Sequence, residues 1–320
     1  MNPLTWQNPG QLFVAQDVIK VNIYSVAELR IYKKTSMDLK LLKVSKDFNV
    51  KKYLFELNDG NKIETVCIKR RTGITVCVST QVGCAVRCAF CVSGKNGLIR
   101  NLTDYEIVQQ VLLVKERINR IVFMGIGEPL HNYSSLIKAI HILRDRNGLN
   151  FPTDGITIST VAPIAQLKRL REEHLKVQLT VSLHATNQSV RDRLIPGMKN
   201  NRIDDTVQAV LSYGERHNRK ITIAYLLLPG INDNLSDKIQ LARWFKGKNV
   251  RINLLPLNKT IGSFQYASKN QLQIFKRELQ SLGLEVTIRE TQGKNIQAAC
   301  GQLAVKQSIK NNKQKKHGLK

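Results

Sequence analysis

Acidic side chains are scarce in this chain. The 320 residues include 50 Lys and Arg but only 24 Asp and Glu, so the formal charge is +26 near neutral pH. Such an excess of positive charge favours a polyanionic partner, either nucleic acid or an anionic membrane surface. A generally solvated basic surface is the alternative that the charge alone leaves open.

Long apolar runs and a secretory signal are also lacking. No stretch of about 18 apolar residues is present, which argues against a membrane span. The first residues, Met1-Asn-Pro-Leu-Thr-Trp, have neither the basic start nor the apolar run of a signal peptide. We therefore expect a cytoplasmic protein without membrane association. In that reducing compartment the six cysteines indicate metal binding or catalysis rather than disulfide bonds.

The two ends of the chain show little periodicity, and no internal repeat is present. Residues 1–50 are expected to form a short, irregular N-terminal segment. Residues 51–73 contain two β-rich runs, at 53–57 and 63–68, around a Gly-containing turn, which predicts a β-hairpin extension. Residues 305–320 form a polar, basic tail that we expect to be disordered without a polyanionic partner.

Between residues 74 and 304, short β-branched runs alternate with amphipathic stretches, the pattern of repeated βα units. Strands are expected at 74–79, 120–124, 155–159, 177–183, 220–227 and 250–255, with a seventh apolar run at 285–289. Helices are expected at 104–117, where Thr103 and Glu106 form a capping-box pattern, and at 134–146, 164–173, 203–217, 235–246 and 269–282. The fold class is therefore α/β, a partial (βα)6 barrel, with its chemistry in the loops that follow the C-terminal ends of the strands.

Three cysteines stand within eight residues in Cys84-Ala-Val-Arg-Cys88-Ala-Phe-Cys91. A structural zinc site usually needs four ligands, and no second Cys-x-x-Cys or His-x-x-x-His pair completes one. A redox pair would use Cys88 and Cys91 and leave Cys84 without a role. Three thiolates on a [4Fe–4S] cluster would leave one iron open to a small molecule. Cys84, Cys88 and Cys91 are therefore predicted to be metal ligands. Their spacing resembles that of the radical-SAM superfamily, in which the open iron binds S-adenosylmethionine.

Seven further segments narrow the resemblance. They are Asp59-Gly-Asn-Lys-Ile-Glu64-Thr-Val, Cys77-Val-Ser-Thr-Gln-Val-Gly-Cys84, Phe123-Met-Gly-Ile-Gly-Glu128-Pro-Leu, Ile158-Ser-Thr, Val181-Ser-Leu-His184-Ala, Ile252-Asn-Leu-Leu-Pro-Leu-Asn258 and Gln297-Ala-Ala-Cys300-Gly-Gln-Leu. In this order, over about residues 55 to 304, they resemble the RlmN/Cfr family of radical-SAM RNA (adenosine) methyltransferases. The resemblance implies methylation of a ring carbon of adenosine in rRNA and possibly tRNA, with a [4Fe–4S] cluster, two S-adenosylmethionine molecules per turnover and an electron donor such as flavodoxin or ferredoxin. Pro129, after Glu128, looks more like the carbon-2 branch of the family than the carbon-8 branch.

The resemblance also implies a role for each matching residue. Cys300 would become an S-methylcysteine intermediate, Cys77 would release the product through a transient disulfide with Cys300, and Glu64 would accept the ring proton. The carboxylate of Glu128 would pair with the ammonium group of S-adenosylmethionine. The other expected contacts to this cofactor are Gly127, Ser159, Ser182, Leu183, His184 and Asn258.

Simpler interpretations stand beside these roles. Cys77 could be an ordinary buried thiol, Glu64 a solvated strand carboxylate, and His184 a satisfied core histidine. Typical family members carry a helical RNA-binding domain before the hairpin, where this chain has about 50 residues. RNA contacts would then depend on other cations, and the candidates are Arg70, Arg71, Arg87, Lys95, Arg100, Lys199 and the tail. A radical-SAM enzyme with another substrate and a non-catalytic RNA-binding module with a structural zinc are the competing hypotheses.

Overall fold

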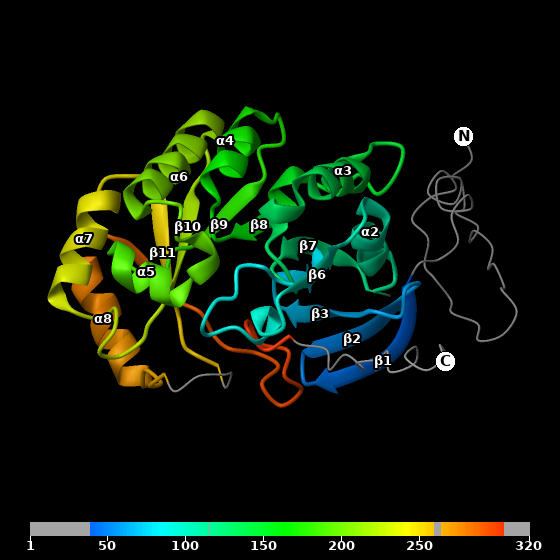
Figure 1. Ribbon diagram of the computed structural model, residues 1–320, viewed down its shortest axis with the longest axis horizontal. Helices are drawn as coiled ribbons and strands as arrows, with labels where there is room; N and C mark the ends of the chain where they lie inside the picture. The colour runs from blue at the N-terminus through cyan, green and yellow to red at the C-terminus, as the bar shows by residue number, and fades with distance from the viewer. Residues whose placement is uncertain (1–38, 115, 259–263, 304–320) are drawn as a thin grey trace, which may run out of the picture.

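A ten-stranded sheet organises the molecule (Figure 1). The computed structural model describes residues 39–114, 116–258 and 264–303. The strands lie in the order β1 (Leu39–Asp47), β2 (Val50–Leu57), β3 (Lys62–Arg70), β4 (Gly73–Cys77), β7 (Ile118–Phe123), β8 (Ile156–Thr160), β9 (Gln178–Ser182), β10 (Ile221–Leu226), β11 (Val250–Leu255) and β12 (Glu285–Ile288). Pairing is antiparallel from β1 to β4 and parallel from β4 to β12. The predicted α/β class with an N-terminal β extension is confirmed.

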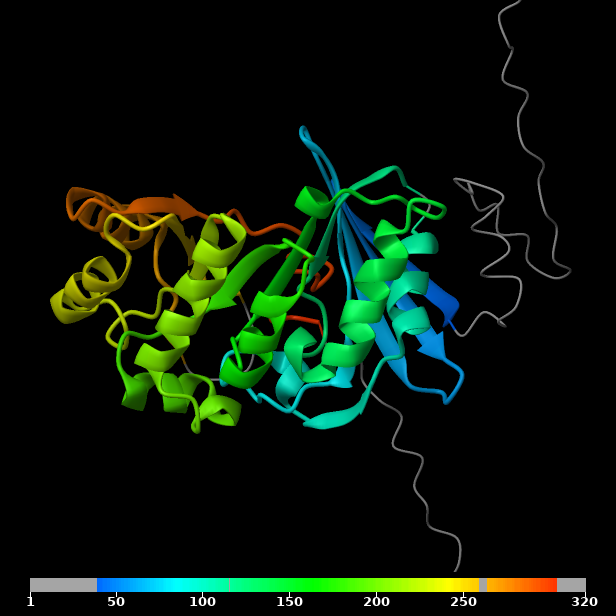
Figure 2. The same ribbon diagram turned by 90° about the horizontal axis from the view of Figure 1, so that it is seen from above.

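Helices connect the parallel strands and cover one side of the curved sheet, while the segment after β12 lies on the other side (Figure 2). They are α2 (Asp104–Leu112), α3 (Tyr133–Arg144), α4 (Ile164–Glu172), α5 (Gln188–Leu194), α6 (Ile203–His217), α7 (Leu235–Phe245) and α8 (Lys269–Ser281). Buried side chains such as Phe123 of β7, Leu136 of α3 and Leu179 of β9 form the core between strands and helices. No helix in the described ranges is long and apolar enough to cross a bilayer.

The elements that were not predicted include β1, α5 and the short strands β5 (Gln81–Gly83) and β6 (Leu98–Asn101). β1 lies at 39–47, within a segment expected to be irregular, and the prediction was wrong there because a bulge between Leu41 and Lys43 interrupts the alternation of this edge strand. Helix α5 has only seven residues, too few for a clear period. The capping box at the start of α2 is confirmed, since Thr103 and Glu106 exchange hydrogen bonds of 3.1 and 2.8 Å. Residues 1–38 and 304–320 lie outside the described part of the chain.

The extension strand β3 is buried on both faces, and its alternation decides what each face meets. Thr65 points to the helices, where its hydroxyl donates to Gln110 of α2 at 2.8 Å. Because side chains alternate along a strand, Glu64 and Val66 point to the opposite face. There Val66 packs in one apolar cluster with Cys77 and with Ala298 from the segment after β12. The predicted catalytic residues therefore share the face without helices.

Candidate functional site

The loop that carries Cys84, Cys88 and Cys91 follows the short strand β5 (Gln81–Gly83). Hydrogen bonds attach it to the end of α5 and the following turn: Ala89 N donates to Leu194 O, and Gly197 N donates to Val86 O, both at 2.9 Å. Cys84 is buried, and Cys88 and Cys91 are partly buried. These hydrogen bonds hold the loop near the C-terminal ends of the central strands.

The three thiols lie close enough to raise one another's pKa. Burial raises the pKa of Cys84 to about 12, and burial together with Cys91 and Cys84 raises the pKa of Cys88 well above its usual value. Such thiols need a metal to become thiolates. Across the described ranges, no three His, Cys, Asp or Glu side chains converge as ligands of a single ion. Three cysteine thiols on one loop fit a [4Fe–4S] cluster, which normally takes four thiolates and would here keep one iron open to another ligand.

Gly127 and Glu128 follow β7. Gly127 has φ +108°, and a Cβ there would lie 2.6 Å from Cβ of Gln81, so only glycine fits. Glu128 is buried, and its carboxylate accepts hydrogen bonds from Leu130 N at 3.0 Å, from Val161 N at 2.9 Å and from the hydroxyl of Thr160. Burial nevertheless raises the pKa of Glu128 to about 7. A carboxyl in this state gains from a cationic partner.

The predicted cofactor contacts Ser159, Ser182, Leu183 and His184 lie at the adjacent ends of β8 and β9. Ser159 and Ser182 are partly exposed, whereas Leu183 and His184 are buried. His184 has φ +58°, its Nδ1 accepts from Leu226 N at 3.0 Å, and its ring meets the edge of Phe90 at 4.9 Å. Burial lowers the pKa of His184 to about 3, so the imidazole is neutral. A structural role for His184 is therefore visible, and it leaves Nε2 for a further contact.

A loop near the end of the described chain brings Cys300 to the cysteine loop. Asn258, after β11, donates from Nδ2 to Cys300 O at 3.0 Å. Val92 N donates to Gly301 O at 2.9 Å, and the hydroxyl of Ser93 donates to Leu303 O at 2.6 Å. The Cys300 loop therefore spans the end of β11 and the residues directly after Cys91.

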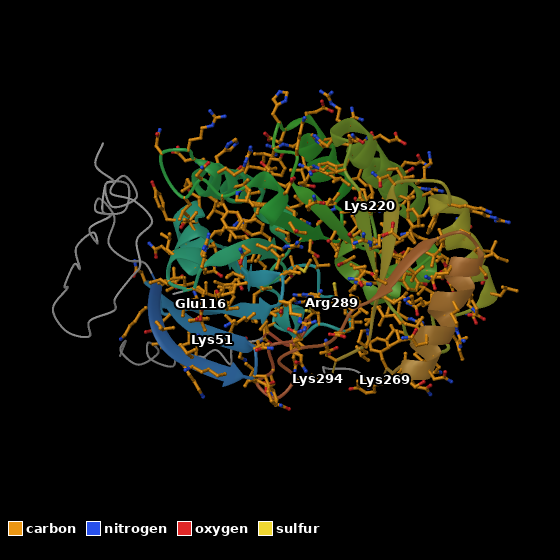
Figure 3. The ribbon with its side chains drawn as sticks, turned by 180° about the vertical axis from the view of Figure 1, so that it is seen from behind. Lys51, Glu116, Lys220, Lys269, Arg289 and Lys294 are labelled. Carbon is orange, nitrogen blue, oxygen red and sulfur yellow. The ribbon has the colours of Figure 1, made fainter. Side chains whose placement is uncertain are left out.

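Cys77 lies at the end of β4, beneath the same loop. Its thiol is buried with Val66, Ala298 and Leu303 in one apolar cluster. Burial, with a smaller effect of Cys300, raises the pKa of Cys77 to about 12, and the guanidinium of Arg289 opposes that rise. Figure 3 shows Arg289 on the segment that leads from β12 toward the extension. Cys77 and Cys300 are free thiols that lie within electrostatic range of each other.

Glu64, on strand β3 of the N-terminal extension, is the third predicted catalytic residue. It is only 5% exposed, so it is not a solvated carboxylate. Lys52 of β2 pairs with Glu64 Oε1 at 2.7 Å and donates to Gln297 O at 3.3 Å. Lys52 thus connects the carboxylate to the Cys300 loop. Lys52 could not be identified beforehand, because an exposed lysine and a half-buried, paired lysine in a strand look alike in sequence.

Two other residues of the site were missed. Thr160 bonds to Glu128, and its place directly after Ser159 was a usable signal. Arg191 on α5 is completely buried, which its sequence context of Arg-Asp-Arg gave no reason to expect.

Of the predicted phosphate contacts, five are exposed, and these are Arg70, Arg71, Arg87, Lys95 and Lys199. Arg100 is instead engaged in ion pairs with Asp59 at 2.5 Å and Glu106 at 2.8 Å. Such pairs hold its guanidinium in place and make it a weaker candidate for RNA contact. The basic tail lies outside the described residues.

Known proteins resemble the chain in sequence and fold. The model of the radical-SAM superfamily matches residues 78–242. A probable RNA methyltransferase of Rhodopseudomonas palustris is 51% identical over 79% of this chain and 70% of its own length. A probable dual-specificity RNA methyltransferase RlmN of Thermotoga maritima is 44% identical over 84% of this chain and 80% of its own length.

A solved structure agrees with these relatives. The crystal structure of a radical SAM methyltransferase from Sphaerobacter thermophilus superposes with a TM-score of 0.80 at 37% identity, and covers 83% of this chain and 81% of that one. The resemblance extends beyond the superfamily core, because these matches span more of the chain than residues 78–242. The chain therefore belongs to the RlmN/Cfr family of radical-SAM RNA methyltransferases.

Proposed function

We propose that this protein methylates carbon 2 of an adenosine in ribosomal RNA, with transfer RNA as a second substrate. The observation that carries the proposal is the gathering of Glu64, Cys77 and Cys300 on one face of the sheet, beside the cysteine loop. An enzyme that only cleaved S-adenosylmethionine would need no second pair of thiols. Pro129 supports carbon 2 over carbon 8 through its resemblance to that branch of the family.

Cofactor binding is assigned to the strand ends. Cys84, Cys88 and Cys91 would hold the [4Fe–4S] cluster, and Glu128 would meet the ammonium group of S-adenosylmethionine. The remaining contacts to this cofactor would be Gly127, Ser159, Ser182, Leu183, His184 and Asn258. When bound, the cluster and two S-adenosylmethionine molecules per turnover supply the methyl group and the radical chemistry that an electron-poor ring carbon requires. A protein such as flavodoxin or ferredoxin would deliver the electron.

The two thiols are suited to different steps. Cys300 is partly exposed next to the cysteine loop, so its thiolate can attack the methyl carbon of S-adenosylmethionine, with S-adenosylhomocysteine as the leaving group. Cys77 is buried, and its raised pKa keeps the thiol protonated at rest, which protects it from methylation. Burial thus selects which of the two neighbouring cysteines carries the methyl group.

Release of the product would use Cys77. After the methyl carbon has joined the base, the Cys77 sulfur attacks the Cys300 sulfur, a disulfide forms, and the bond from Cys300 to the carbon breaks. For the step to balance, the base adduct first gives its unpaired electron back to the electron carrier and its ring proton to Glu64. The carbon that leaves Cys300 then keeps the electron pair and takes the proton that the Cys77 thiol loses. Lys52 orients the carboxylate of Glu64. An external thiol must then reduce the disulfide before the next turnover.

The test uses ribosomal RNA from a strain that lacks this gene. Protein purified and reconstituted without oxygen is incubated with S-adenosylmethionine and a reductant, and the RNA digest is analysed by mass spectrometry. We expect about four irons per chain and the appearance of 2-methyladenosine. Cleavage of S-adenosylmethionine without methyladenosine would favour another substrate. One zinc per chain without iron would favour the binding module.

A further inference from the structure

Arg191 on helix α5 is a completely buried cation. Its exposed fraction is 0%, and its guanidinium donates to three backbone carbonyls. Nη1 reaches Leu183 O at 2.7 Å and Ser182 O at 3.4 Å, while Nη2 reaches Val161 O at 2.8 Å. Nε is buried and has no hydrogen-bond partner among the described residues. The side chain therefore connects the ends of β8 and β9, and its Nε–H is a donor that these bonds leave unused.

The positive charge of Arg191 lacks a paired carboxylate. Within the described part of the chain, no Asp or Glu lies at salt-bridge distance from it, and the neighbouring Asp192 accepts a hydrogen bond from Gln188 at 2.7 Å. Burial lowers the pKa of Arg191 to about 10, still high enough for the group to stay charged at neutral pH. A buried cation without a counter-charge is strongly unfavourable. The buried charge of Arg191 therefore indicates that an anion lies near it when the protein has bound its cluster.

Cys88 is the group placed to provide that anion. The cysteine loop is bonded to the last turn of α5 through Ala89 N and Leu194 O at 2.9 Å. Cys88 packs with Val190 and Leu194 in one apolar cluster. A negative charge on Cys88 would raise the pKa of Arg191, and it would do so more than the charge of Asp192 does. Arg191 therefore lies on the helix against which the loop of a predicted metal ligand packs.

We propose that Arg191 is a positioning residue whose fixed positive charge compensates the negative charge gathered at Cys88 when the cluster is bound. The proposal rests on the ligand role of Cys88 given under the proposed function. Three thiolates leave the cluster with a net negative charge that increases on reduction. A nearby cation stabilises the reduced form more than the oxidised form, so it raises the reduction potential. The bonds to Ser182 and Leu183 would at the same time fix the strand end that contacts S-adenosylmethionine.

The experiment compares Arg191→Gln and Arg191→Lys in anaerobically reconstituted protein. The midpoint potential of the cluster is measured by redox titration with electron paramagnetic resonance, first without S-adenosylmethionine. We expect Arg191→Gln to shift the potential to more negative values and Arg191→Lys to stay near wild type, because lysine keeps the charge. Arg193→Gln, an exposed position on the same helix, is the matched control and should leave the potential unchanged.

Each of the other possible results supports or contradicts the proposed charge role of Arg191. Equal shifts in both Arg191 variants, or none in Arg191→Gln, would overturn the charge role. Weaker binding of S-adenosylmethionine at an unchanged potential would also overturn it and assign the side chain to the cofactor's carboxylate. Loss of iron in Arg191→Gln but not in Arg191→Lys would support the proposal, whereas loss in both would reduce Arg191 to a scaffold residue. A wild-type protein without iron would instead contradict the proposed function.

Discussion

The two groups of thiols in this protein are built in opposite ways. Cys84, Cys88 and Cys91 belong to one short loop, which is bonded to α5 and the turn after it. Cys77 and Cys300 come from the first parallel strand and from the far end of the described chain, and only the folded sheet brings them together. The first group is a local feature that spacing can reveal. The second depends on long-range structure.

Strands β1 and β2 of the extension help to hold the loop that carries Cys300. Asn295 donates to Asp47 of β1 at 3.1 Å, and Lys52 of β2 donates to Gln297 O at 3.3 Å. Gly293, at φ +70°, turns the chain so closely that a Cβ would lie 2.9 Å from Ala298 Cβ. The Cys300 loop is therefore anchored on β1 and β2 as well as on Asn258 and on the residues after Cys91. The extension is a structural part of the candidate active site.

The largest expected effect separates the two groups directly. Cys88→Ala and Cys300→Ala should each lower RNA methylation by at least about a thousandfold, because each removes a group that no neighbour replaces. Only Cys300→Ala should keep the iron and cleave S-adenosylmethionine. Iron analysis and chromatography of the cleavage products measure this. Iron loss in Cys300→Ala would show that the groups are not independent.

Glu64→Gln should affect only the second group. Loss of a general base lowers the rate by roughly a hundredfold to ten-thousandfold. We expect methylation to fall within that range while iron content and cleavage of S-adenosylmethionine stay at wild-type values. Single-turnover assays with RNA make the measurement. An unchanged rate would remove Glu64 from the mechanism.

Lys52→Met tests whether the extension supports the second group. Its ion pair with Glu64 leaves only 14% and 7% of the two side chains exposed, so breaking it should lower the free energy of unfolding by about 2 kcal/mol. The control is Lys51→Met, on the adjacent position, whose side chain lies beside Glu116 in Figure 3. The side chains of this pair are 39% and 26% exposed. That pair should contribute less than about 1 kcal/mol. Urea unfolding compares the variants, and equal losses would argue against a special role for Lys52.

A smaller effect is expected for Glu128, which lies near Cys84 and Cys88 of the first group. Its pKa near 7 lies above the ordinary value of a carboxyl, so the charged form that pairs with an ammonium group increases as the pH rises through 7. Affinity for S-adenosylmethionine should therefore increase about tenfold from pH 6 to pH 8. Anaerobic calorimetry gives the affinities. Glu128→Gln should bind weakly at every pH, and a variant that kept the pH dependence would assign it to another residue.

Local patterns made much of the fold predictable. The parallel strands, the Thr103–Glu106 cap and the cysteine loop each depend on residues close in sequence. Strand β1 and helix α5 were not predicted, because the bulge in β1 and the short length of α5 remove the periodic signal. In the site, the pairing of Lys52 with Glu64 and the burial of Arg191 depend on tertiary contacts, which a single sequence does not contain.

The central claim is that Cys77 and Cys300 act on one RNA-bound carbon, and Cys77→Ala tests it most directly. The variant should still attach RNA to Cys300 but fail to release it. Denaturing electrophoresis, followed by mass spectrometry of the digested adduct, would then find RNA covalently bound at Cys300. Normal release of methylated RNA, with no adduct, would contradict the two-thiol account.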